Sequence, residues 1–361
     1  MLRRPPPSLT WPRALVLLWL GAIAGFAVGA EWIRSRPAPL PAPSGGVDLT
    51  GAGATFPYPL YRRWFEAYGA ETGVRINYYS VGSTTGLALM LRDGADFGAT
   101  DRPLTAEETA RARCAPLVVP TAIGTVAVIA HLPGVAEGPR LDAATLAAIY
   151  AGAITRWDDD RLRALNPALA LPALPIRPVH RGRGSGTAAL LEAYLSSVAS
   201  ATAPTPWIVG DSVEGNEGVA AQVQAVPGSL GFVEASYASH PRLLVAALRN
   251  RAGAFVTPDS LSLALAAEEG LAAVDVDTAL ALTTARAAGA YAIAGITRLV
   301  AAGALRDTTR ARHFVAFARW ALREGTPTLR ALGFAPVPAS VQAQVARRLA
   351  AVVPGACAEA S

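Results

Sequence analysis

Lysine is absent from this chain of 361 residues, and cysteine and methionine occur only twice each. The two cysteines, Cys114 and Cys357, allow at most one disulfide bond, so the fold cannot depend on a disulfide framework. Charged residues make up only 16% of the sequence and hydrophobic residues 52%, a composition that excludes a large disordered region. A chain of this length is sufficient for two domains of ordinary size.

The positive charge of the chain is concentrated at its N-terminus. Residues 1–46 carry five arginines and one glutamate, a net charge of +4, whereas the whole chain carries +5. The rest of the chain, at about +1, is therefore close to neutral and lacks the basic stripe of a nucleic-acid-binding protein. We expect no nucleic-acid partner.

The sequence signatures of common catalytic sites are also missing. No Gly-Lys-Ser/Thr signature is present, which excludes a P-loop, and no Gly-x-Ser-x-Gly elbow surrounds Ser83, Ser185 or Ser229. The four histidines are not spaced as metal ligands. The acidic residues within 157–160 could form a metal-binding site, but acidic residues are also typical of the first turn of a helix. We expect no catalysis, no metal and no cofactor.

Two alternatives remain open for the N-terminus. Several arginines precede an uncharged run, Ala14–Ala30, that ends in small residues. This pattern is typical of a cleaved signal peptide, but residues 14–33 could also serve as a retained membrane anchor. A proline-rich linker follows up to residue 46. Either alternative places the protein outside the cytoplasm, where the two cysteines could form one disulfide bond or remain separate thiols.

Strand-like and helix-like segments alternate along the rest of the chain, which predicts an α/β architecture. We expect strands at residues 47–50, 75–80, 95–100, 176–180, 230–233 and 291–300, and a buried strand pair around Gly124 within 117–130. We expect helices at residues 57–70, 84–92, 141–150, 158–165, 187–197, 218–225, 308–324 and 341–352, and helices joined by turns at 258–284.

Three short segments rich in glycine, serine and threonine lie where a predicted strand leads into a helix. They are residues 51–56 (Gly-Ala-Gly-Ala-Thr-Phe), 81–86 (Val-Gly-Ser-Thr-Thr-Gly) and 181–187 (Arg-Gly-Arg-Gly-Ser-Gly-Thr). The N–H groups of a helix N-terminus attract anions, glycine permits close approach, and hydroxyls add donors. Each segment by itself is also explained as an ordinary helix cap. Three together, one of them with Arg181, predict a pocket for a small tetrahedral oxyanion.

Asp101, at the end of a predicted strand, indicates which oxyanion this is. A carboxylate suits an anion pocket only if it accepts a proton from the ligand. Phosphate carries such a proton at neutral pH and sulfate does not, so a buried acceptor favours phosphate. The alternative is an ordinary turn aspartate before Arg102-Pro103.

These segments, in this order, resemble the substrate-binding protein of the bacterial high-affinity phosphate ABC transporter, the PstS family. The resemblance covers roughly Asp48 to Pro354 and is looser in the C-terminal third. It is strongest at residues 49–57 (Leu-Thr-Gly-Ala-Gly-Ala-Thr-Phe-Pro), 95–101 (Ala-Asp-Phe-Gly-Ala-Thr-Asp) and 184–187 (Gly-Ser-Gly-Thr), with further matches at 215–218 and 231–234.

The resemblance implies a two-lobed periplasmic-binding-protein fold with a hinge and an anion site in the cleft between the lobes. We expect residues 47–130 and 291–361 in lobe I, residues 131–290 in lobe II, and residues 1–46 as the targeting segment and linker. The phosphate ligands carried over from the family are Thr55, Phe56, Ser83 and Asp101 from lobe I and Arg181, Ser185, Gly186 and Thr187 from lobe II.

The function implied is binding of inorganic phosphate in the periplasm and its delivery, without catalysis, to ABC transporter permease subunits. We expect a monomer. A membrane-tethered phosphate sensor or scavenger of the same fold is an alternative, and an extracytoplasmic phosphoesterase is a less favoured one because no nucleophile–base pair or two-metal cluster is evident.

One residue departs from the family pattern. The family often has an acidic residue, paired with the binding arginine, where this chain has Arg183. Two arginines in one loop predict tighter and less proton-sensitive anion binding with some loss of selectivity against sulfate. The alternative is that Arg183 points into solvent and changes little.

Overall fold

The computed structural model describes residues 48–198, 209–272, 275, 277–283, 285–302 and 306–356. Its strands are β1 (Leu49–Gly53), β2 (Ile76–Ser80), β3 (Phe97–Thr100), β4 (Leu117–Ala130), β5 (Arg140–Leu141), β6 (Arg177–Arg181), β7 (Asp211–Val213), β8 (Ser229–Glu234), β9 (Leu244–Val245), β10 (Ala247–Arg249), β11 (Phe255–Val256) and β12 (Ala294–Ala301). Its helices are α2 (Tyr58–Thr72), α3 (Ser83–Leu91), α4 (Ala106–Arg111), α5 (Ala143–Tyr150), α6 (Asp160–Leu165), α7 (Gly186–Val198), α8 (Gly215–Ala225), the short 3₁₀ helix η1 (Ala235–Ala238), α9 (Ser260–Ala272), α10 (Thr308–Arg323), α11 (Thr326–Ala331) and α12 (Ala339–Ala351).

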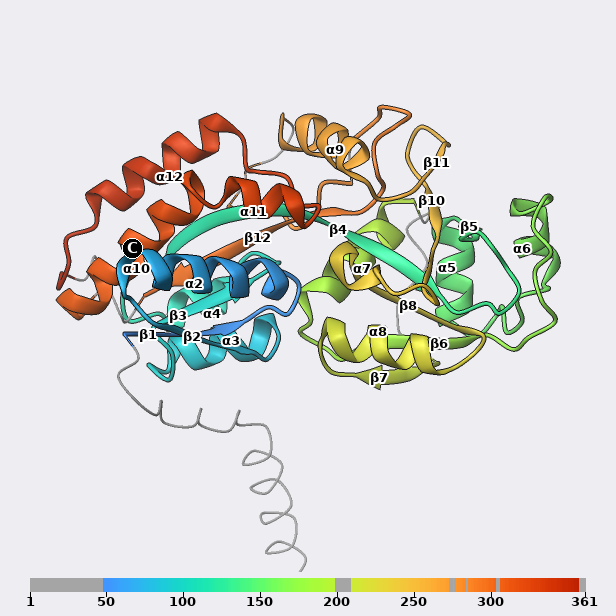
Figure 1. The fold of residues 1–361 in the computed structure, drawn as a ribbon, viewed down its shortest axis with the longest axis horizontal. Coiled ribbons are helices and arrows are strands. Elements are labelled where there is room, and N and C mark those ends of the chain that lie inside the picture. Colours follow the sequence, from blue (N-terminus) through green and yellow to red (C-terminus); the bar gives the residue numbers. More distant parts are fainter. Residues whose placement is uncertain are drawn as a thin grey trace, which may run out of the picture. The chain divides into compact units, whose positions relative to one another are not determined.

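The strands form two lobes that share one long strand, β4. In the first lobe the order is β2-β1-β3-β12-β4, and in the second it is β4-β8-β6-β7. The N-terminal part of β4 pairs with β12 as far as Thr125, and its remainder pairs with β8 from Val126 onward. Figure 1 shows β4 running from the lobe that holds β1 to β3 into the lobe that holds β6 to β8. The predicted two-lobed α/β fold is confirmed.

Parallel pairing places the ends of several strands at common edges. Strand β1 is parallel to β2 and β3, and β6 is parallel to β7 and β8. Ligands of open parallel sheets bind outside the carboxyl ends of the strands. Because β1, β2 and β3 end near one another, the residues that follow them are brought together in the first lobe.

The first lobe is stabilised by an aromatic core. Helix α2 buries Trp64, Phe65 and Tyr68 on one face, as its periodicity predicts. The Phe65 ring centroid lies 5.2 Å from that of Phe317 on α10, and the Trp64 indole donates to the Gly325 carbonyl at 3.0 Å. Burying such large rings is a major source of folding free energy. This core fixes the N-terminal end of α2 beside the strand ends.

Two predicted turns are wrong, and glycine is the reason in both cases. We expected a turn at Gly51–Gly53, but these residues continue β1, and a Cβ on Gly51 would lie 2.1 Å from the Phe97 ring. We expected a break at Gly124, but β4 is one continuous strand of 14 residues. A Cβ on Gly124 would meet the rings of Phe56 and Phe334 at 2.7 and 2.8 Å. These glycines provide space for aromatic rings.

Two helix predictions also need correction. Helix α8 begins at Gly215, before Asn216 and not after it, because the left-handed conformation of Gly215 (φ +72°) turns the chain into the helix. In the stretch predicted as joined helices, α9 is helical, whereas the described residues 277–283 are not.

Pro120 produces an irregularity inside β4. The pairing of β4 with β12 shifts register between Thr297 and Arg298, so Thr121 has no direct opposite residue. Proline cannot donate to a sheet ladder and is tolerated in sheet interiors at such bulges. The Thr121 hydroxyl donates to the Thr297 carbonyl at 3.0 Å, which gives this carbonyl a hydrogen-bond partner at the bulge.

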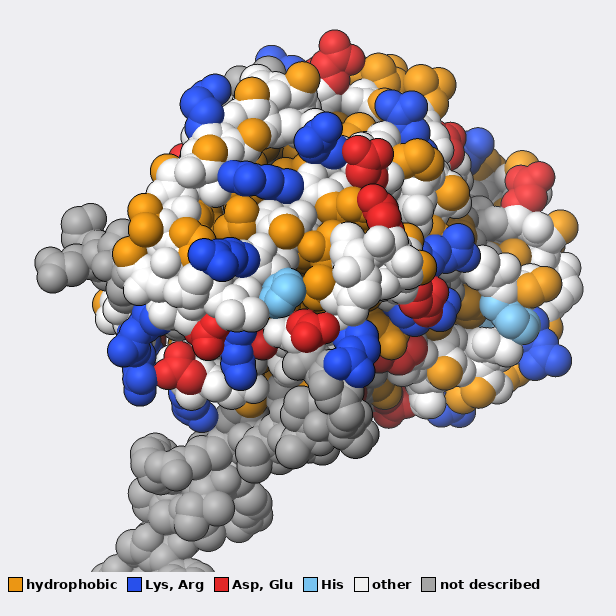
Figure 2. Space-filling model, turned by 60° about the vertical axis from the view of Figure 1, so that its left-hand side comes forward, with side chains coloured by type: hydrophobic (Ala, Val, Ile, Leu, Met, Phe, Trp, Pro, Cys, Tyr) orange, Lys and Arg blue, Asp and Glu red, His pale blue; other side chains and the backbone are white. Residues whose placement is uncertain are grey.

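The described surface carries both signs of charge. Figure 2 shows arginine and carboxylate side chains interspersed over one face, as expected for a nearly neutral body. None of the described helices is long and apolar enough to cross a bilayer. The predicted signal peptide or anchor at residues 14–33 and the linker lie outside the described residues, as does Cys357. Cys114 is buried.

Candidate functional site

Residues that follow strand ends in the two lobes meet in one buried cluster. From the first lobe come Thr55 after β1, Ser83 at the start of α3 and Asp101 after β3. From the second lobe come Arg181 at the end of β6 and the start of α7 at residues 185–187. All of these side chains are buried, so the sequence-predicted residues are brought together as expected from the strand order.

Thr55 is the centre of a hydrogen-bond network that joins the lobes. Its Oγ1 accepts from Asn216 Nδ2 at 2.7 Å, from the Asn216 backbone N–H at 3.2 Å, and from Arg181 Nη1 at 3.3 Å. Asn216 Nδ2 also donates to Thr187 Oγ1 at 3.1 Å, and its Oδ1 accepts from the Glu234 N–H at 2.8 Å. Asn216 is fully buried, so it holds one residue of each lobe in place.

Asn216 contacts both Thr55 and Thr187, so it joins the two lobes across the cleft. Tyr237 was not anticipated, and its hydroxyl donates to the Thr55 carbonyl at 2.7 Å. The Phe56 side chain lies in the first-lobe core, edge-to-face with Phe334 at 6.1 Å, which leaves only its backbone for a ligand.

Ser83 and Asp101 lie against the start of α7. Ser83 Oγ is 3.5 Å from Asp101 Oδ2 and accepts from the Asp101 N–H at 3.4 Å. A Cβ added to Gly186 would lie 2.6 Å from Ser83 Oγ and 2.7 Å from Asp101 Oδ2. Only glycine at this position permits the second lobe to approach the first so closely.

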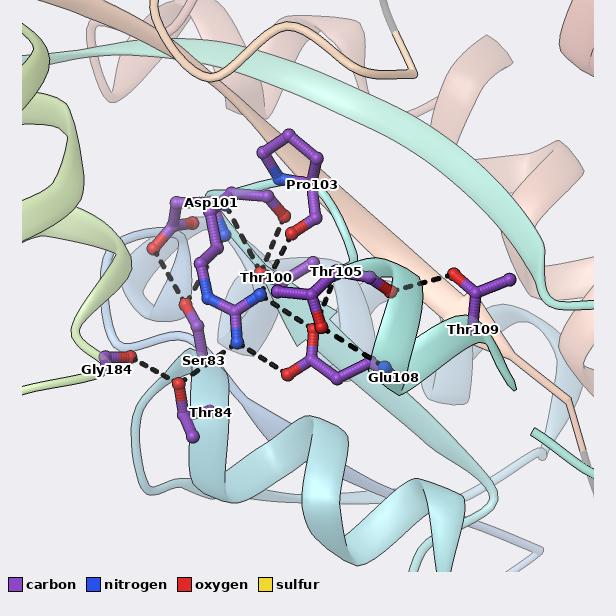
Figure 3. Close-up of polar contacts among 10 residues, drawn as sticks. Ser83, Thr84, Thr100, Asp101, Pro103, Thr105, Glu108, Thr109 and Gly184 are labelled. Carbon is purple, nitrogen blue, oxygen red and sulfur yellow. Dashed lines mark hydrogen bonds and ion pairs between the residues drawn. The ribbon is translucent and has the colours of Figure 1, made fainter. Parts of the chain in front are cut away.

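Thr84 makes a second contact between the lobes (Figure 3). Its Oγ1 donates to the Gly184 carbonyl at 2.9 Å, and it accepts from Arg102 Nη2 at 3.1 Å. Arg102 is itself held by both carboxylate oxygens of Glu108, at 2.6 and 2.8 Å. A pocket of about 110 Å³ adjoins this contact, and it is lined by residues 81, 82, 84, 85, 181–185 and Glu214.

Burial dominates the electrostatics of Asp101. The side chain is 1% exposed, and burial raises its pKa from 3.8 to about 7. A hydrogen bond from Thr297 and the positive charges of Arg298 and Arg181 oppose that increase in pKa. Asp101 Oδ1 is buried without a hydrogen-bond partner of normal geometry, so it can accept a proton from a ligand.

Arg181 is the complementary group. It is 3% exposed, and burial lowers its pKa, while the carboxylates of Glu214 and Glu217 raise it. Its Nε is buried without a hydrogen-bond partner. Buried polar groups without partners are uncommon in folded proteins and indicate a binding site when they converge. Together Arg181 and Asp101 offer one donor and one acceptor to a small oxyanion that carries a proton.

The remaining candidate residues lie around this cluster or away from it. Ser185 Oγ accepts from the Ala188 N–H at 3.3 Å, so it caps α7 as well as facing the cluster. Arg183 is exposed, and no ion pair is found for it within the described residues. Asp159 caps α6 and pairs with Arg161 at 3.0 Å, which confirms the acidic run as a helix start. No cluster of metal ligands occurs in the described part of the chain.

Three buried residues near Asp101 were missed by sequence reasoning. Thr297 and Arg298 lie on β12, and Glu234 ends β8 with a pKa raised by burial to about 8. Arg298 is fully buried, and burial lowers its pKa to about 10. Thr297 and Arg298 are adjacent polar residues within an otherwise apolar predicted strand, and this pattern was the sequence signal that could have identified them.

The chain matches the model of a PBP superfamily domain over residues 40–324. It is 34% identical over 307 residues to the phosphate-binding protein PstS of Xylella fastidiosa, covering 83% of this chain and 84% of that protein. Among solved structures, a high-affinity periplasmic phosphate-binding protein with bound phosphate matches with a TM-score of 0.64 at 21% identity, covering 83% of this chain and 93% of that one. An ABC-type phosphate transport receptor from Vibrio cholerae matches with a TM-score of 0.52 at 18% identity, covering 80% and 100%.

The two solved structures share the fold, and the sequence relative matches this chain over most of the length of both proteins. With this identity and coverage, the chain belongs to the PBP superfamily and, within it, to the family of phosphate-binding proteins named PstS.

Proposed function

We propose that this protein binds inorganic phosphate between its two lobes and delivers it to the permease subunits of an ABC transporter. The observation that carries the proposal is that the buried cluster between the lobes holds two buried polar atoms without hydrogen-bond partners, Asp101 Oδ1 from the first lobe and Arg181 Nε from the second. A buried acceptor beside a buried guanidinium suits an oxyanion that still carries a proton. The names of the relatives, which describe phosphate binding and transport, support the same ligand.

The proposed ligands come from both lobes. They are Thr55, Phe56, Ser83 and Asp101 from the first and Arg181, Ser185, Gly186 and Thr187 from the second. Asp101 accepts the phosphate proton, Arg181 supplies the charge, and the hydroxyl and N–H groups donate. Because phosphate contacts residues of both lobes, its binding favours the conformation in which the two lobes are closed around it.

The protein acts outside the cytoplasm in this proposal, as a monomer and without catalysis. A periplasmic location is supported by the description of the related solved protein. Retention of residues 14–33 as an anchor would favour a tethered sensor or scavenger with the same site. Sizing of the mature N-terminus by mass spectrometry separates a cleaved from a retained segment.

Calorimetric titration of the ligand-stripped protein, with phosphate and then sulfate, tests the proposed function. We expect one phosphate site per chain, from which sulfate does not displace phosphate at pH 8. Equal binding of both anions would contradict the acceptor function of Asp101. Binding of neither would overturn the proposal.

Replacing Gly186 with alanine is expected to weaken phosphate binding roughly ten- to hundred-fold, because overpacking costs about 1–3 kcal/mol. The added Cβ would overlap Ser83 Oγ and the Asp101 side chain across the cleft. Calorimetry provides the affinity, and small-angle scattering shows whether phosphate still compacts the molecule.

Gly182→Ala is the matched control for this substitution. It lies in the same loop, and its Cβ would meet only Ser212 Oγ at 3.7 Å, an ordinary contact. Phosphate affinity within two-fold of wild type is expected for the control. If both variants bind equally well, close contact at Gly186 is not needed for binding.

Arg183→Asp is expected to weaken phosphate binding and to make it more sensitive to pH. Arg183 is exposed, so solvent screening limits the change to a few-fold. A pH series of phosphate and sulfate affinities for this variant and for wild type measures the effect. Identical series would mean that Arg183 only faces solvent.

A further inference from the structure

Asn216 is a fully buried amide near the start of α8, and it lies between two of the proposed phosphate ligands. Its Nδ2 contacts Thr55 Oγ1 at 2.7 Å and Thr187 Oγ1 at 3.1 Å. A hydroxyl can either donate or accept, whereas the nitrogen of an amide only donates and its oxygen only accepts. The orientation of the Asn216 amide therefore decides whether the two threonines donate to a ligand or accept from it.

The backbone of Glu234 fixes the orientation of this amide. The Glu234 N–H, at the end of β8, can only donate, and it donates to Asn216 Oδ1 at 2.8 Å. An amide rotated by 180° would set its NH₂ group against this N–H, and two buried donors would face each other without an acceptor. Nδ2 therefore faces the threonines, and both bonds run from the amide to the hydroxyl oxygens.

Thr55 Oγ1 is surrounded by donors. Besides Asn216 Nδ2, the backbone N–H of Asn216 donates to it at 3.2 Å and Arg181 Nη1 donates to it at 3.3 Å. None of these three groups can accept a hydrogen bond, so the hydroxyl hydrogen of Thr55 has to point away from all of them. None of the partners of this hydroxyl in the described part of the chain is an acceptor.

Thr187 repeats this arrangement in the second lobe. It is the second residue of α7, it is buried, and within the described residues its hydroxyl has one hydrogen-bond partner, the Nδ2 of Asn216. Its hydroxyl hydrogen, like that of Thr55, is thus left for another acceptor. A buried donor without an acceptor is costly and uncommon. Since both hydroxyls are bonded to the same nitrogen atom, their two hydrogens are available to one ligand.

A small oxyanion provides the acceptors that these two hydrogens lack, because its unprotonated oxygens only accept. We propose that Asn216 is a positioning residue that turns the Thr55 and Thr187 hydroxyls into hydrogen-bond donors toward the bound anion. Asp101 then accepts the proton of one phosphate oxygen, while the two threonines donate to unprotonated oxygens. This inference rests on the proposed phosphate function and deepens it.

Asn216→Asp reverses the direction of these hydrogen bonds at pH 8. A carboxylate at this position accepts from both threonine hydroxyls, so that lone pairs, in place of hydrogens, face the anion. Each hydrogen bond to a charged group contributes about ten- to hundred-fold to affinity. We therefore expect the affinity for inorganic phosphate, measured by calorimetry on the full chain, to fall at least about hundred-fold.

Thr187→Val separates this effect from the negative charge that aspartate adds. Valine has the shape of threonine but no hydroxyl, so only Thr55 is left for residue 216 to orient. The added charge repels phosphate equally with and without the Thr187 hydroxyl, whereas the orienting effect is smaller without it. We expect the factor by which Asn216→Asp weakens binding to be at least about three-fold smaller in the Thr187→Val background than in wild type. Equal factors in the two backgrounds overturn the inference.

Neutron diffraction from deuterated crystals of the wild-type protein locates the hydrogens directly. With phosphate bound, we expect both hydroxyl deuterons to point at phosphate oxygens and the Asn216 amide deuterons to point at the two threonine oxygens. A hydroxyl deuteron of Thr55 or Thr187 that points at Asn216 or at a backbone carbonyl overturns the inference. This measurement needs no variant, so it decides the question even if Asn216→Asp does not fold.

The same measurement distinguishes failure of this inference from failure of the proposed function. If the protein binds no phosphate, crystals grown without it are used, and both hydroxyl deuterons are still expected to point away from Asn216. That result would support the orienting effect of Asn216 and overturn phosphate binding alone. Deuterons directed at Asn216 in a protein that binds phosphate would overturn the orienting effect alone.

Discussion

The Asp101→Asn variant is expected to bind sulfate nearly as well as phosphate at pH 8, whereas the wild-type protein prefers phosphate strongly. An ionised Asp101 accepts the phosphate proton, but it confronts sulfate with an unpaired buried carboxylate. Such a mismatch costs about 1–3 kcal/mol or more, so discrimination should fall by at least about ten-fold. Asparagine can donate through its amide and no longer repels sulfate. Competition calorimetry measures both affinities.

The wild-type protein provides the internal control for this prediction. Because burial raises the pKa of Asp101 to about 7, a growing fraction of the carboxyl is protonated as the pH falls below 7. Sulfate should therefore compete better at pH 5.5 than at pH 8 in wild type, and equally at both in Asp101→Asn. A sulfate affinity of wild type that does not change with pH would show that Asp101 is not the discriminating group.

The same variant is expected to be more stable than wild type above about pH 7 when no ligand is bound. The pKa of Asp101 is higher in the folded chain than its ordinary 3.8, so the stabilising protonated form is fully present below about pH 4 and is lost as the pH rises through about 7. Each pKa unit corresponds to about 1.4 kcal/mol, so the gain at pH 8.5 is at most about 4 kcal/mol. Urea unfolding at pH 5 and pH 8.5 measures it. A variant less stable than wild type at both pH values would contradict the linkage.

Arg181→Met is expected to produce the largest loss of phosphate affinity, about hundred- to several-thousand-fold. Methionine fills much of the same volume but removes the charge and the donors, and removing one partner of a buried ionic interaction costs about 3–5 kcal/mol. Arg181 is 3% exposed, and its Nε is free to donate to a ligand. Calorimetry or ligand displacement at pH 8 measures the loss.

Arg183→Met in the same loop is the matched control, because Arg183 is exposed. The control is expected to change the affinity only a few-fold. Arg181→Lys separates charge from shape, since lysine keeps the charge but loses the planar fork. Wild-type affinity in Arg181→Met would exclude a direct contact of this residue with phosphate.

Local chemistry explains which features were predictable. The helix starts at Ser83 and Gly186 and the strand end at Asp101 depend on residues within a few positions, so they could be read from glycine, hydroxyl and apolar patterns. Helices α4 and α11, each of six residues, were missed because one and a half turns carry little periodicity, whereas α6, of the same length, was predicted with its acidic first turn.

Glycine shows where local reasoning failed. The same residue type marks a turn in one context and a close approach in another. Gly51 and Gly124 belong to strands because the rings of Phe97, Phe56 and Phe334 occupy the space beside them. Phe97 lies on β3, and Phe56 and Phe334 lie in connecting segments far from Gly124 in the sequence, so no window of sequence around the glycines shows these rings.

The sequence by itself determined the α/β character, the strand-to-helix segments and the residues able to bind a protonated oxyanion, because each follows from short-range periodicity and donor chemistry. Only the tertiary structure decided what surrounds Asp101. Pairing of β12 with β3 brings Arg298 opposite Thr100, the residue before Asp101, and α8 brings Asn216 between Thr55 and Thr187. Burial, which raises the pKa of Asp101 to about 7, is a property of the packed chain, since it depends on what excludes water from the carboxylate.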